Sequence, residues 1–409
     1  MGELLRRYWY PIAISSELGI KPLRRRLLGE DLVVYRTRSG RVGVMQESCP
    51  HRRASMAYGI PEEDGLRCGY HGWVFDPEGT CLEQPAEPAS STFKDRIRAT
   101  AYPAQELGGM IHVYLGPDPA PLLPRFDLYV WEDVWREIWW ADLPFSWMNP
   151  MENSVDPHHA EWLHGHYGAF VDELETGVKR DATVYVKPHQ KVGFDEFEFG
   201  IIKRRMLEGA SEEDDDWKIG HPLVFPHMLR RGFAWQHMFQ IRVPVDDHTT
   251  RHYWYTAYKG PEGFVMPAQD EIPVMEVPWQ KPDGDFDVSF VDGQDIMAWA
   301  TQGAIYDRSL EHLGQSDRGI IMLRRMFERE LEKVEQGLDP IGVIRDPAKN
   351  EIISLPTEKK KLGGGTKYWK DLIATGTHRY SPFTPKITDL FEQFEEYERR
   401  QADAVRDGQ

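Results

Sequence analysis

Two short segments of the sequence each place a cysteine and a histidine close together. Residues 47–56 read ESCPHRRASM and residues 67–75 read RCGYHGWVF, so the pairs are Cys49-x-His51 and Cys68-x2-His71, with sixteen residues between them. Two thiolates and two imidazoles are a complete donor set for a metal centre. Two kinds of centre use such a set: a structural zinc ion, and a [2Fe–2S] cluster in which two cysteines hold one iron and two histidines hold the other.

The distribution of the four donors between the two segments helps to distinguish a zinc ion from a [2Fe–2S] cluster. Zinc sites of this composition usually pair cysteine with cysteine and histidine with histidine at short spacing. Here each segment supplies one donor of each type, which lets both loops reach both irons of a cluster. The pattern favours the two-iron centre, and zinc stays open as the alternative. Cys81 lies outside both segments and is expected to be a small buried hydrophobic residue.

A second group of donors occupies residues 152–164, ENSVDPHHAEWLH, as Asn153-x2-Asp156-x2-His159-x4-His164. On an α-helix, Asp156 and His159 share a face, whereas His164 lies about 140° farther round. The helix must therefore bend or loosen before His164 can join His159 on one ion. Two imidazoles with one carboxylate bind non-haem Fe(II) and leave positions open for dioxygen and substrate. A third ligand from elsewhere in the chain is then needed.

The elements that must position the first donor group are short strands. From about Trp9 to Leu115, β-branched and aromatic segments alternate with turn residues, such as the DPEG sequence at 76–79. Three prolines within residues 116–121 preset φ and remove backbone donors. We therefore expect an all-β domain over residues 1–117 and a second domain over residues 118–409.

The second domain mixes strands and helices. Apolar residues occupy every second position from Phe233 to Val245, which is the period of a strand with one buried face. Residues 252–258 follow after a turn, so a hairpin is expected. The helical spacing of apolar residues predicts a helix over 320–334, ended by Gly337, and a charged helix over about 387–400.

Composition excludes several classes of function. The chain has 409 residues, 41% of them hydrophobic, which is enough for two or three domains. Its formal net charge of −17 argues against a nucleic-acid partner. Three cysteines cannot build a disulfide framework, and they fit a reducing cytoplasm. No apolar run reaches the roughly 18 residues that span a bilayer, so we expect neither a membrane segment nor a signal peptide.

Together the two donor groups resemble those of the Rieske non-haem iron aromatic-ring oxygenases. CPHR and CGYHGW are similar to the two cluster-binding loops of Rieske proteins, and the Asn/Asp/His/His pattern is similar to the iron-binding segment of that family. The likeness extends from Tyr8 to Asp317. It implies an α+β chain: an N-terminal all-β Rieske domain, then a helix-grip catalytic domain with a curved antiparallel sheet.

The resemblance also implies the ligands of both centres. The implied ligands of the [2Fe–2S] cluster are Cys49, His51, Cys68 and His71, and those of a mononuclear Fe(II) are His159, His164 and Asp295. Residues 292–319, DGQDIMAWATQGAIYDRSLEHLGQSDRG, resemble the ligand helix of the phthalate-dioxygenase-like branch, and this likeness selects Asp295. Asp307 and Glu311 in the same segment are competing carboxylates.

In that family, electrons pass from NAD(P)H through a separate flavin- or ferredoxin-type reductase to the cluster. They then cross to the iron of a neighbouring subunit, in a trimer or a stacked hexamer. Asp156 corresponds to the carboxylate that joins His71 to an iron-ligand histidine across that interface. A negative charge at a helix end is the other role open to Asp156. Asn153 is expected near the iron without binding it.

The implied reaction is oxygenation of an aromatic, carboxylated small molecule by O2, either as ring dihydroxylation or as O-demethylation. Guanidinium groups bind carboxylates bidentately, and the candidates are Arg204, Arg205, Arg230, Arg231 and Arg242. Two alternatives remain: a Rieske monooxygenase of an alkylamine or a sterol, and a non-catalytic zinc or ligand-binding protein. The other nearby histidines are expected to have packing or surface roles: His158, His166, His227 and His237.

Overall fold

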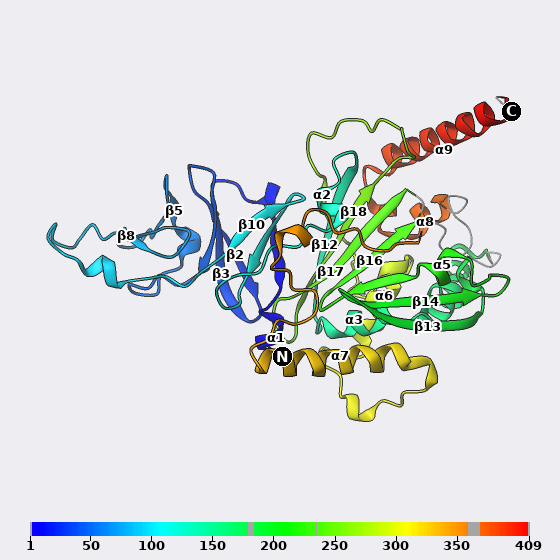
Figure 1. Ribbon diagram of the computed structural model, residues 1–409, viewed down its shortest axis with the longest axis horizontal. Helices are drawn as coiled ribbons and strands as arrows, with labels where there is room; N and C mark the ends of the chain where they lie inside the picture. Colours follow the sequence, from blue (N-terminus) through cyan, green and yellow to red (C-terminus); the bar gives the residue numbers. More distant parts are fainter. Residues whose placement is uncertain (1, 179–183, 234, 359–368, 408–409) are drawn as a thin grey trace. The chain divides into compact units, whose positions relative to one another are not determined.

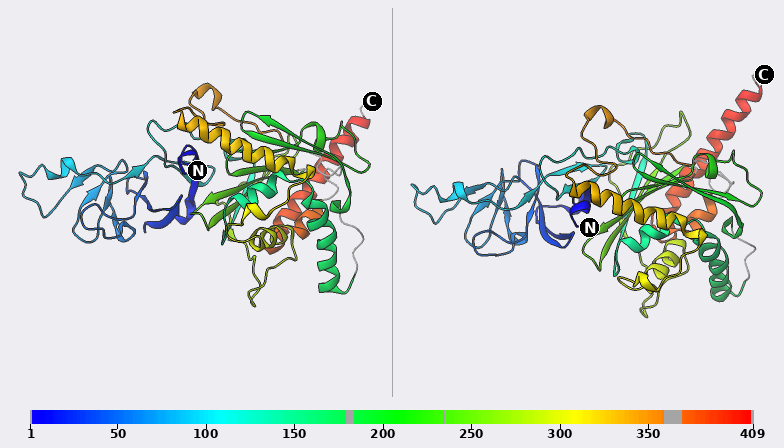
Figure 2. Two further views of the ribbon diagram at one scale, coloured as in Figure 1. Left: turned by 90° about the horizontal axis from the view of Figure 1, so that it is seen from below. Right: turned by 60° about the horizontal axis from the view of Figure 1, so that its bottom comes forward.

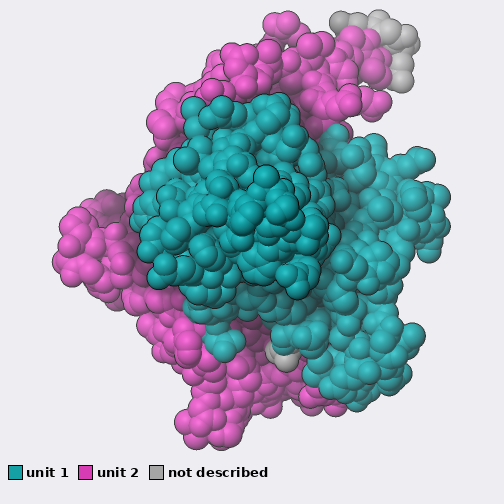
Figure 3. All heavy atoms as spheres, turned by 90° about the vertical axis from the view of Figure 1, so that its left-hand side faces the viewer, with its two compact units in different colours: residues 1–130, 243–247, 329–353 teal, residues 131–242, 248–328, 354–409 magenta. Residues whose placement is uncertain are grey.

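The computed structural model describes residues 2–178, 184–233, 235–358 and 369–407. The chain divides into two compact units, coloured in Figure 3. Unit 1 comprises Met1–Val130, Val243–Asp247 and Arg329–Ile353, and unit 2 comprises Trp131–Arg242, His248–Glu328 and Ser354–Gln409. Unit 1 thus includes two later segments in addition to the N-terminal stretch. Among the described residues, no helix is both long and apolar enough to cross a membrane.

Unit 1 is built from three small antiparallel sheets (Figure 1). Their strand orders are β1 (Trp9–Ile14), β11 (Met110–Tyr114), β10 (Ala104–Leu107); β2 (Leu23–Leu27), β3 (Glu30–Arg36), β4 (Val42–Gln46), β9 (Ala101–Tyr102); and β5 (Ile60–Pro61), β6 (Leu66–Arg67), β7 (Val74–Phe75), β8 (Cys81–Glu83). The two Cys/His segments are the β4–β5 and β6–β7 connections. Their cysteines belong to a buried cluster with Tyr35, Met45 and Phe75, so the core of this unit anchors both loops.

Unit 2 contains one eight-stranded sheet, several of whose strands are labelled in Figure 1. Its strand order is β13 (His189–Phe197), β14 (Gly200–Leu207), β15 (His221–Val224), β16 (Met228–Phe233), β17 (Gln236–Pro244), β18 (Thr250–Tyr258), β12 (Trp135–Leu143) and β19 (Val274–Glu276). β12 pairs antiparallel with β18 and parallel with β19, and the neighbouring strands from β13 to β17 pair antiparallel. The predicted α+β class, with an all-β first part and an antiparallel sheet in the second, is confirmed.

The strand predicted over Phe233–Val245 is wrong in two respects. Its first residue, Phe233, ends β16, whereas β17 begins at Gln236 and pairs antiparallel with β16. The strand is also buried on both faces, because the alternating polar residues Gln240 and Arg242 are 4% and 0% exposed. Arg242 Nη2 donates to Gln240 Oε1 at 2.7 Å. The sequence pattern predicts that this face is exposed to solvent. It can be buried because its polar side chains hydrogen-bond to each other.

The helices include both predicted ones. They are α1 (Gly2–Leu5), α2 (Asp127–Val130), α3 (Met148–Val155), α4 (Gly168–Thr176), α5 (Asp215–Lys218), α6 (Val291–Thr301), α7 (Arg318–Glu335), α8 (Trp369–Thr375) and α9 (Thr384–Asp407), together with a π-helix, η4 (Ala160–Tyr167). Among the described residues, 3-10 turns occur at Ser15–Glu17, Met56–Tyr58, Phe93–Arg96, Val184–Val186, Arg308–Leu310, Gln315–Asp317, Pro347–Lys349 and Thr377–Tyr380.

The packing of these helices sets the site. α6 contacts both α3 and η4, and α3 also contacts β16. The first part of α9 packs its apolar face, including Phe391 and Phe394, against Trp235, while its C-terminal end projects away from the sheet (Figures 1 and 2). α3 therefore joins the second donor group to the eight-stranded sheet, and α6 joins η4 to α3.

Candidate metal centres

The two Cys/His loops of unit 1 have the same backbone hydrogen bonds. In the first loop, Cys49 N donates to Ala54 O at 2.8 Å and Arg53 N donates to Cys49 O at 2.9 Å. In the second, Cys68 N donates to Trp73 O at 2.8 Å and the residue four after the cysteine, Gly72, donates back to Cys68 O at 3.0 Å. The residue at this fourth position has a positive φ in both loops, 64° at Arg53 and 76° at Gly72. The loops are thus two copies of one turn.

The cysteines of these loops point into the core and the histidines lie nearer the surface. Cys49 and Cys68 are 1% and 3% exposed, whereas His51 is exposed and His71 half-buried. The imidazole centroids of His51 and His71 lie 4.6 Å apart, and His51 stacks on Trp73 at 4.3 Å. Both histidines are therefore at the same end of the unit.

The donor set fits a two-iron cluster better than a single zinc ion. Burial, followed by the nearby Cys68, raises the pKa of the Cys49 thiol to about 11, a cost that bound metal removes because it deprotonates its thiol ligands. The two thiols are buried and the two imidazoles lie nearer the surface. This separation matches a two-iron cluster in which the cysteines hold one iron and the histidines hold the other.

In unit 2 the structure brings His159, His164 and Asp295 together, although 130 residues lie between the last two in the sequence. Their ligand atoms all lie within 4.8 Å of one another. Oδ1 of Asp295 is 3.3 Å from Nε2 of His164 and 3.8 Å from Nε2 of His159. This oxygen is buried and has no hydrogen-bond partner among the described residues. Two imidazoles and one otherwise unsatisfied carboxylate oxygen fit a divalent cation.

The charges of this group stabilise one another. Burial lowers the pKa of His164, but the adjacent Asp295 carboxylate outweighs it and leaves that pKa above its ordinary value. Burial likewise raises the pKa of Asp295, and His164 outweighs it, so that pKa is lowered. The pair thus favours an anionic oxygen on Asp295 and a positive charge next to it at His164, and a metal ion bound between the two groups would supply that positive charge.

A π-helix accounts for the spacing of the two histidines. His159 immediately precedes η4, and His164 lies within it, five residues farther on. A π-helix closes its turns on the fifth residue instead of the fourth, so residues five apart are neighbours on one face. The two rings meet edge to face at 5.3 Å between centroids. The sequence prediction that the helix must loosen between these histidines is confirmed, and the π winding is how it does so.

The competing carboxylates lie elsewhere. Asp307 accepts a hydrogen bond from Ser309 N at 2.9 Å and so caps a 3-10 turn. Glu311 pairs with Arg324 on α7. Both groups are thus engaged in holding the segment that follows α6, and Asp295 alone of the three joins the histidines.

Asp156 ends α3 and begins the next helical stretch. Its Oδ1 accepts from His158 N at 2.8 Å and its Oδ2 accepts from His159 N at 3.2 Å. The same Oδ2 faces His159 Nδ1 at 3.4 Å. Burial raises the pKa of Asp156, but the His159 ring, the His158 N–H and Lys203 outweigh it and lower that pKa. The helix-end role is therefore visible, and it places the carboxylate beside an imidazole of the metal group.

A cavity opens beside the three donors, and its wall carries several basic side chains. Asn153, Tyr185, Lys203, Arg205 and Arg231 line it together with the donors. Asn153 borders the space without belonging to the convergent group. Three basic side chains, Lys203, Arg205 and Arg231, therefore border the cavity next to the metal-ligand candidates.

Sequence reasoning missed Lys203. Its side chain is buried, and Nζ donates to Ser154 O at 2.8 Å and to Asp156 O at 3.1 Å. The ammonium therefore caps the C-terminal carbonyls of α3. Burial lowers its pKa to about 7. A lysine in a strand carries no signal of such a contact, because its partners are backbone carbonyls 47 and 49 residues away.

The five candidate arginines separate into two groups. Arg205 Nε donates to Asp216 at 3.0 Å, and its Nη2 is buried with no partner among the described residues. Arg231 lies 3.9 Å from Asp292. The remaining three do not line the cavity: Arg204 pairs with Asp195, Arg230 contacts His237, and Arg242 bonds Gln240.

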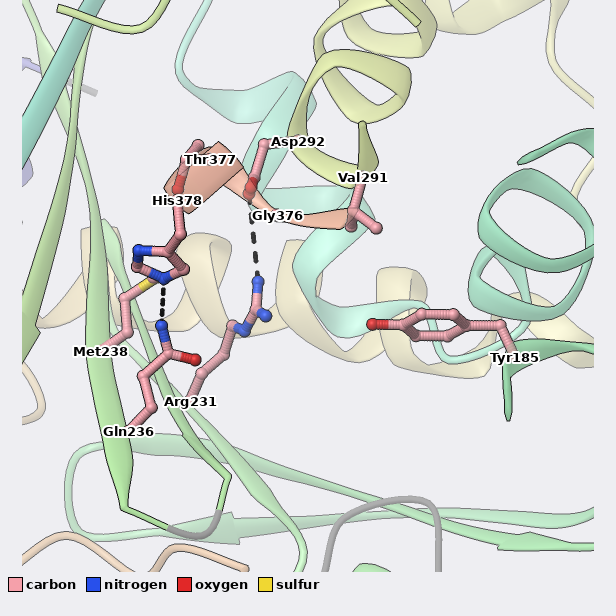
Figure 4. Close-up of a pocket in the computed structure, with 9 residues that line it drawn as sticks. All are labelled: Tyr185, Arg231, Gln236, Met238, Val291, Asp292, Gly376, Thr377 and His378. Carbon is pink, nitrogen blue, oxygen red and sulfur yellow. Dashed lines mark hydrogen bonds and ion pairs between the residues drawn. The ribbon is translucent and has the colours of Figure 1, made fainter. Parts of the chain in front are cut away.

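A second, smaller cavity shares part of this wall. Tyr185, Arg231 and Val291 line both spaces. Figure 4 shows Arg231 directed toward Asp292, with Tyr185 across from it and the Gln236–His378 pair on the other side. Arg231 therefore stands where the two cavities adjoin.

Comparison with known proteins agrees with this division of sites. Residues 8–97 match the Rieske [2Fe-2S] domain, and residues 280–361 match the LigXa C-terminal domain like family. The chain is 43% identical to the 5,5'-dehydrodivanillate O-demethylase oxygenase subunit of Sphingobium sp. (strain NBRC 103272 / SYK-6), over 87% of this chain and 82% of that protein. It is 32% identical to the phenoxybenzoate dioxygenase subunit alpha of Ectopseudomonas oleovorans, over 84% of each.

A solved structure shows the same fold at lower identity. NdmA of Pseudomonas putida CBB5 superposes with a TM-score of 0.59 at 21% identity, covering 82% of this chain and 93% of that one. The match to whole oxygenase subunits leaves the non-catalytic zinc alternative without support. The chain belongs to the Rieske non-haem iron oxygenases: it is an oxygenase subunit whose cofactors are a Rieske [2Fe–2S] cluster and a mononuclear Fe(II), with electrons supplied by a reductase.

Proposed function

We propose that the donors described above are the ligands of the two centres. The cluster is held by Cys49, Cys68, His51 and His71, and the mononuclear iron is held by His159, His164 and Asp295. The support is the paired turns of the two loops and the convergence of three ligand atoms within 4.8 Å. When bound, an iron with two imidazoles and one carboxylate supplies open positions for dioxygen beside the substrate.

We propose an aromatic carboxylate as the substrate. The observation that carries this proposal is Nη2 of Arg205, a buried guanidinium nitrogen in the cavity wall that donates to no described residue. A buried donor without an acceptor is costly, and a substrate carboxylate relieves that cost. Lys203 and Arg231 add positive charge to the same wall. The two named relatives are, by name, a demethylase and a dioxygenase of aromatic carboxylates.

O-demethylation is the reaction we favour, because the relative with 43% identity is an O-demethylase by name. One methoxyarene, one O2, two electrons and two protons then give one phenol, one formaldehyde and one water. The assay supplies methoxylated aromatic acids, NADH and a surrogate reductase, and measures formaldehyde and phenol. A dihydrodiol from an aromatic acid, without formaldehyde from any methoxylated one, would instead identify ring dihydroxylation.

Arg205→Met is expected to raise KM for the aromatic acid about 10- to 100-fold, since a hydrogen bond to a charged group contributes about 1.5–3 kcal/mol. KM for the matching methyl ester is expected to change little. Arg204→Met is the matched control, because successive residues of β14 face opposite sides of the sheet. Equal effects on acid and ester would contradict a carboxylate contact, since a general defect in folding does not distinguish the two.

We further propose a homotrimer, or a stacked hexamer of two trimers, that works with a flavin- or ferredoxin-type reductase in the cytoplasm. None of the three cysteines forms a disulfide bond, which fits that compartment. Three large apolar side chains near the metal-site histidines in the sequence are exposed: Trp162, Phe170 and Leu174 are 67%, 53% and 68% exposed. Exposed apolar patches of this kind mark protein contacts.

Native mass spectrometry is expected to show three or six chains. Trp162→Glu is expected to release single chains with both centres still filled, because a buried charge at a contact is costly. A wild-type chain that is monomeric at micromolar concentration would refute the trimer. A Trp162→Glu variant that keeps the wild-type assembly would show that the contact lies elsewhere.

A further inference from the structure

Gln294 precedes Asp295 on α6, and its side-chain amide contacts two groups on either side of it. The side chain is 4% exposed. Oε1 lies 3.0 Å from His164 Nδ1, and Nε2 donates to Val288 O at 3.1 Å. The amide therefore joins the histidine on η4 to the segment that leads into α6.

The orientation of this amide follows from counting donors and acceptors. A backbone carbonyl such as Val288 O only accepts hydrogen bonds, so the NH2 end of Gln294 must face it. The opposite orientation would set two carbonyl oxygens against each other. Oε1 then faces His164, and because this oxygen carries no proton, Nδ1 of His164 must be the donor. The hydrogen bond thus determines which ring nitrogen of His164 carries the proton.

The consequence appears at the other ring nitrogen. With the proton on Nδ1, neutral His164 has a lone pair on Nε2, and Nε2 lies 3.3 Å from Asp295 Oδ1. Two electron-pair donors facing each other at that distance repel unless a proton or a cation lies between them. A metal ion that occupies this position takes both donors as ligands.

The space around the amide is closely fitted. A Cβ added at Gly168, the first residue of α4, would stand 3.2 Å from Nε2 and 3.7 Å from Oε1 of Gln294. A hydrogen at this position of α4 therefore leaves room for the amide. His159 has a different partner, because its Nδ1 faces the Asp156 carboxylate at 3.4 Å. The two imidazoles are thus held by unlike groups, one anionic and one neutral.

We propose that Gln294 is a positioning residue of the mononuclear centre, whose amide holds His164 as the Nδ1–H tautomer and so directs Nε2 to the metal. This inference rests on the proposed assignment of His164 as a ligand. A partner that orients a metal-bound histidine typically contributes a factor of about 10 to 100 in metal affinity. Gln294 does this without adding a second negative charge beside Asp295.

The test measures Co²⁺ binding to the full chain with its cluster loaded and its mononuclear iron removed. The dissociation constant is obtained by competition with a chromophoric chelator, and the visible absorption of bound Co²⁺ reports its ligand geometry. Gln294→Met keeps the length of the side chain without an acceptor. Gln294→Glu keeps the acceptor toward His164. Gln302→Met, at the exposed C-cap of the same helix, is the matched control.

We expect Gln294→Met to weaken Co²⁺ binding about 10- to 100-fold and to alter its absorption, Gln294→Glu to restore most of the affinity, and Gln302→Met to match wild type. The cluster spectrum should persist in all three. Wild-type binding by Gln294→Met, or equal losses in the Met and Glu variants, would overturn the inference. His164→Ala separates the two claims: if it too binds Co²⁺ as wild type does, the ligand assignment itself fails.

Discussion

Asp295→Ala is expected to empty the mononuclear site and abolish oxygenation while the cluster keeps its spectrum. Two imidazoles without an anionic oxygen hold Fe(II) weakly, and the buried Oδ1 of Asp295 is the atom on which His159 and His164 converge. The loss of affinity should exceed the factor of about 100 that marks the upper range for outer contacts of a metal site. Iron content per chain, measured by elemental analysis after desalting, checks this.

Two other carboxylates serve as matched controls. Asp307→Ala removes a cap on a 3-10 turn, and Glu311→Ala removes an ion pair with Arg324. Both variants should retain iron, because neither side chain belongs to the convergent group. If iron and turnover survive in Asp295→Ala and disappear in either control, Asp295 is the wrong carboxylate. His159→Ala and His164→Ala should reproduce the loss and leave the cluster colour unchanged.

Asp156→Asn should leave both centres filled and slow electron transfer between them by orders of magnitude. The carboxylate already accepts from His158 N and His159 N and faces the His159 ring at 3.4 Å. In the proposed trimer it also accepts an N–H from His71 of a neighbouring subunit. An amide replaces half of that acceptor capacity with donors, so it cannot serve both imidazoles.

The measurement is a single turnover followed by stopped-flow absorbance of the cluster, starting from reduced enzyme with substrate and O2. Reduction of the cluster by the reductase should be unchanged in Asp156→Asn, and only its reoxidation should slow. Glu161→Gln is the control, since this nearby carboxylate pairs with His189 at 3.1 Å. Wild-type reoxidation in Asp156→Asn, with both metals present, would limit Asp156 to its visible role at the helix end.

The two Cys/His loops could be recognised in the sequence because their information is local. Cysteine, histidine and the turn residues lie within a few positions of one another, and the two loops repeat the same hydrogen bonds. Asp295 could be selected only by resemblance, because Asp307 and Glu311 have the same chemistry and nearby positions. The fold separates them by giving each of the other two a different partner.

The rest of the site depends on contacts that leave no pattern in the sequence. Gln294 acts through an amide whose partners, Val288 and His164, lie at unrelated spacings. Arg204 and Arg205 are adjacent, yet only Arg205 lines the cavity, because the strand directs them to opposite sides. The strand predicted from Phe233 was misjudged because the alternating pattern runs across the boundary between two paired strands, β16 and β17. Tertiary packing decides each of these cases.

The π winding of η4 links helix geometry to metal occupancy. His159 and His164 share a face only while turns close on the fifth residue, and ordinary α winding would rotate one ring away. Whatever holds both imidazoles on one ion therefore stabilises the π register. By thermodynamic reciprocity, whatever favours the α register loosens the ion by the same factor. A change in the winding of this segment therefore changes its affinity for the metal ion. A substitution that alters only the helical register of residues 160–167 is expected to weaken iron binding even though the substituted side chain does not contact the iron.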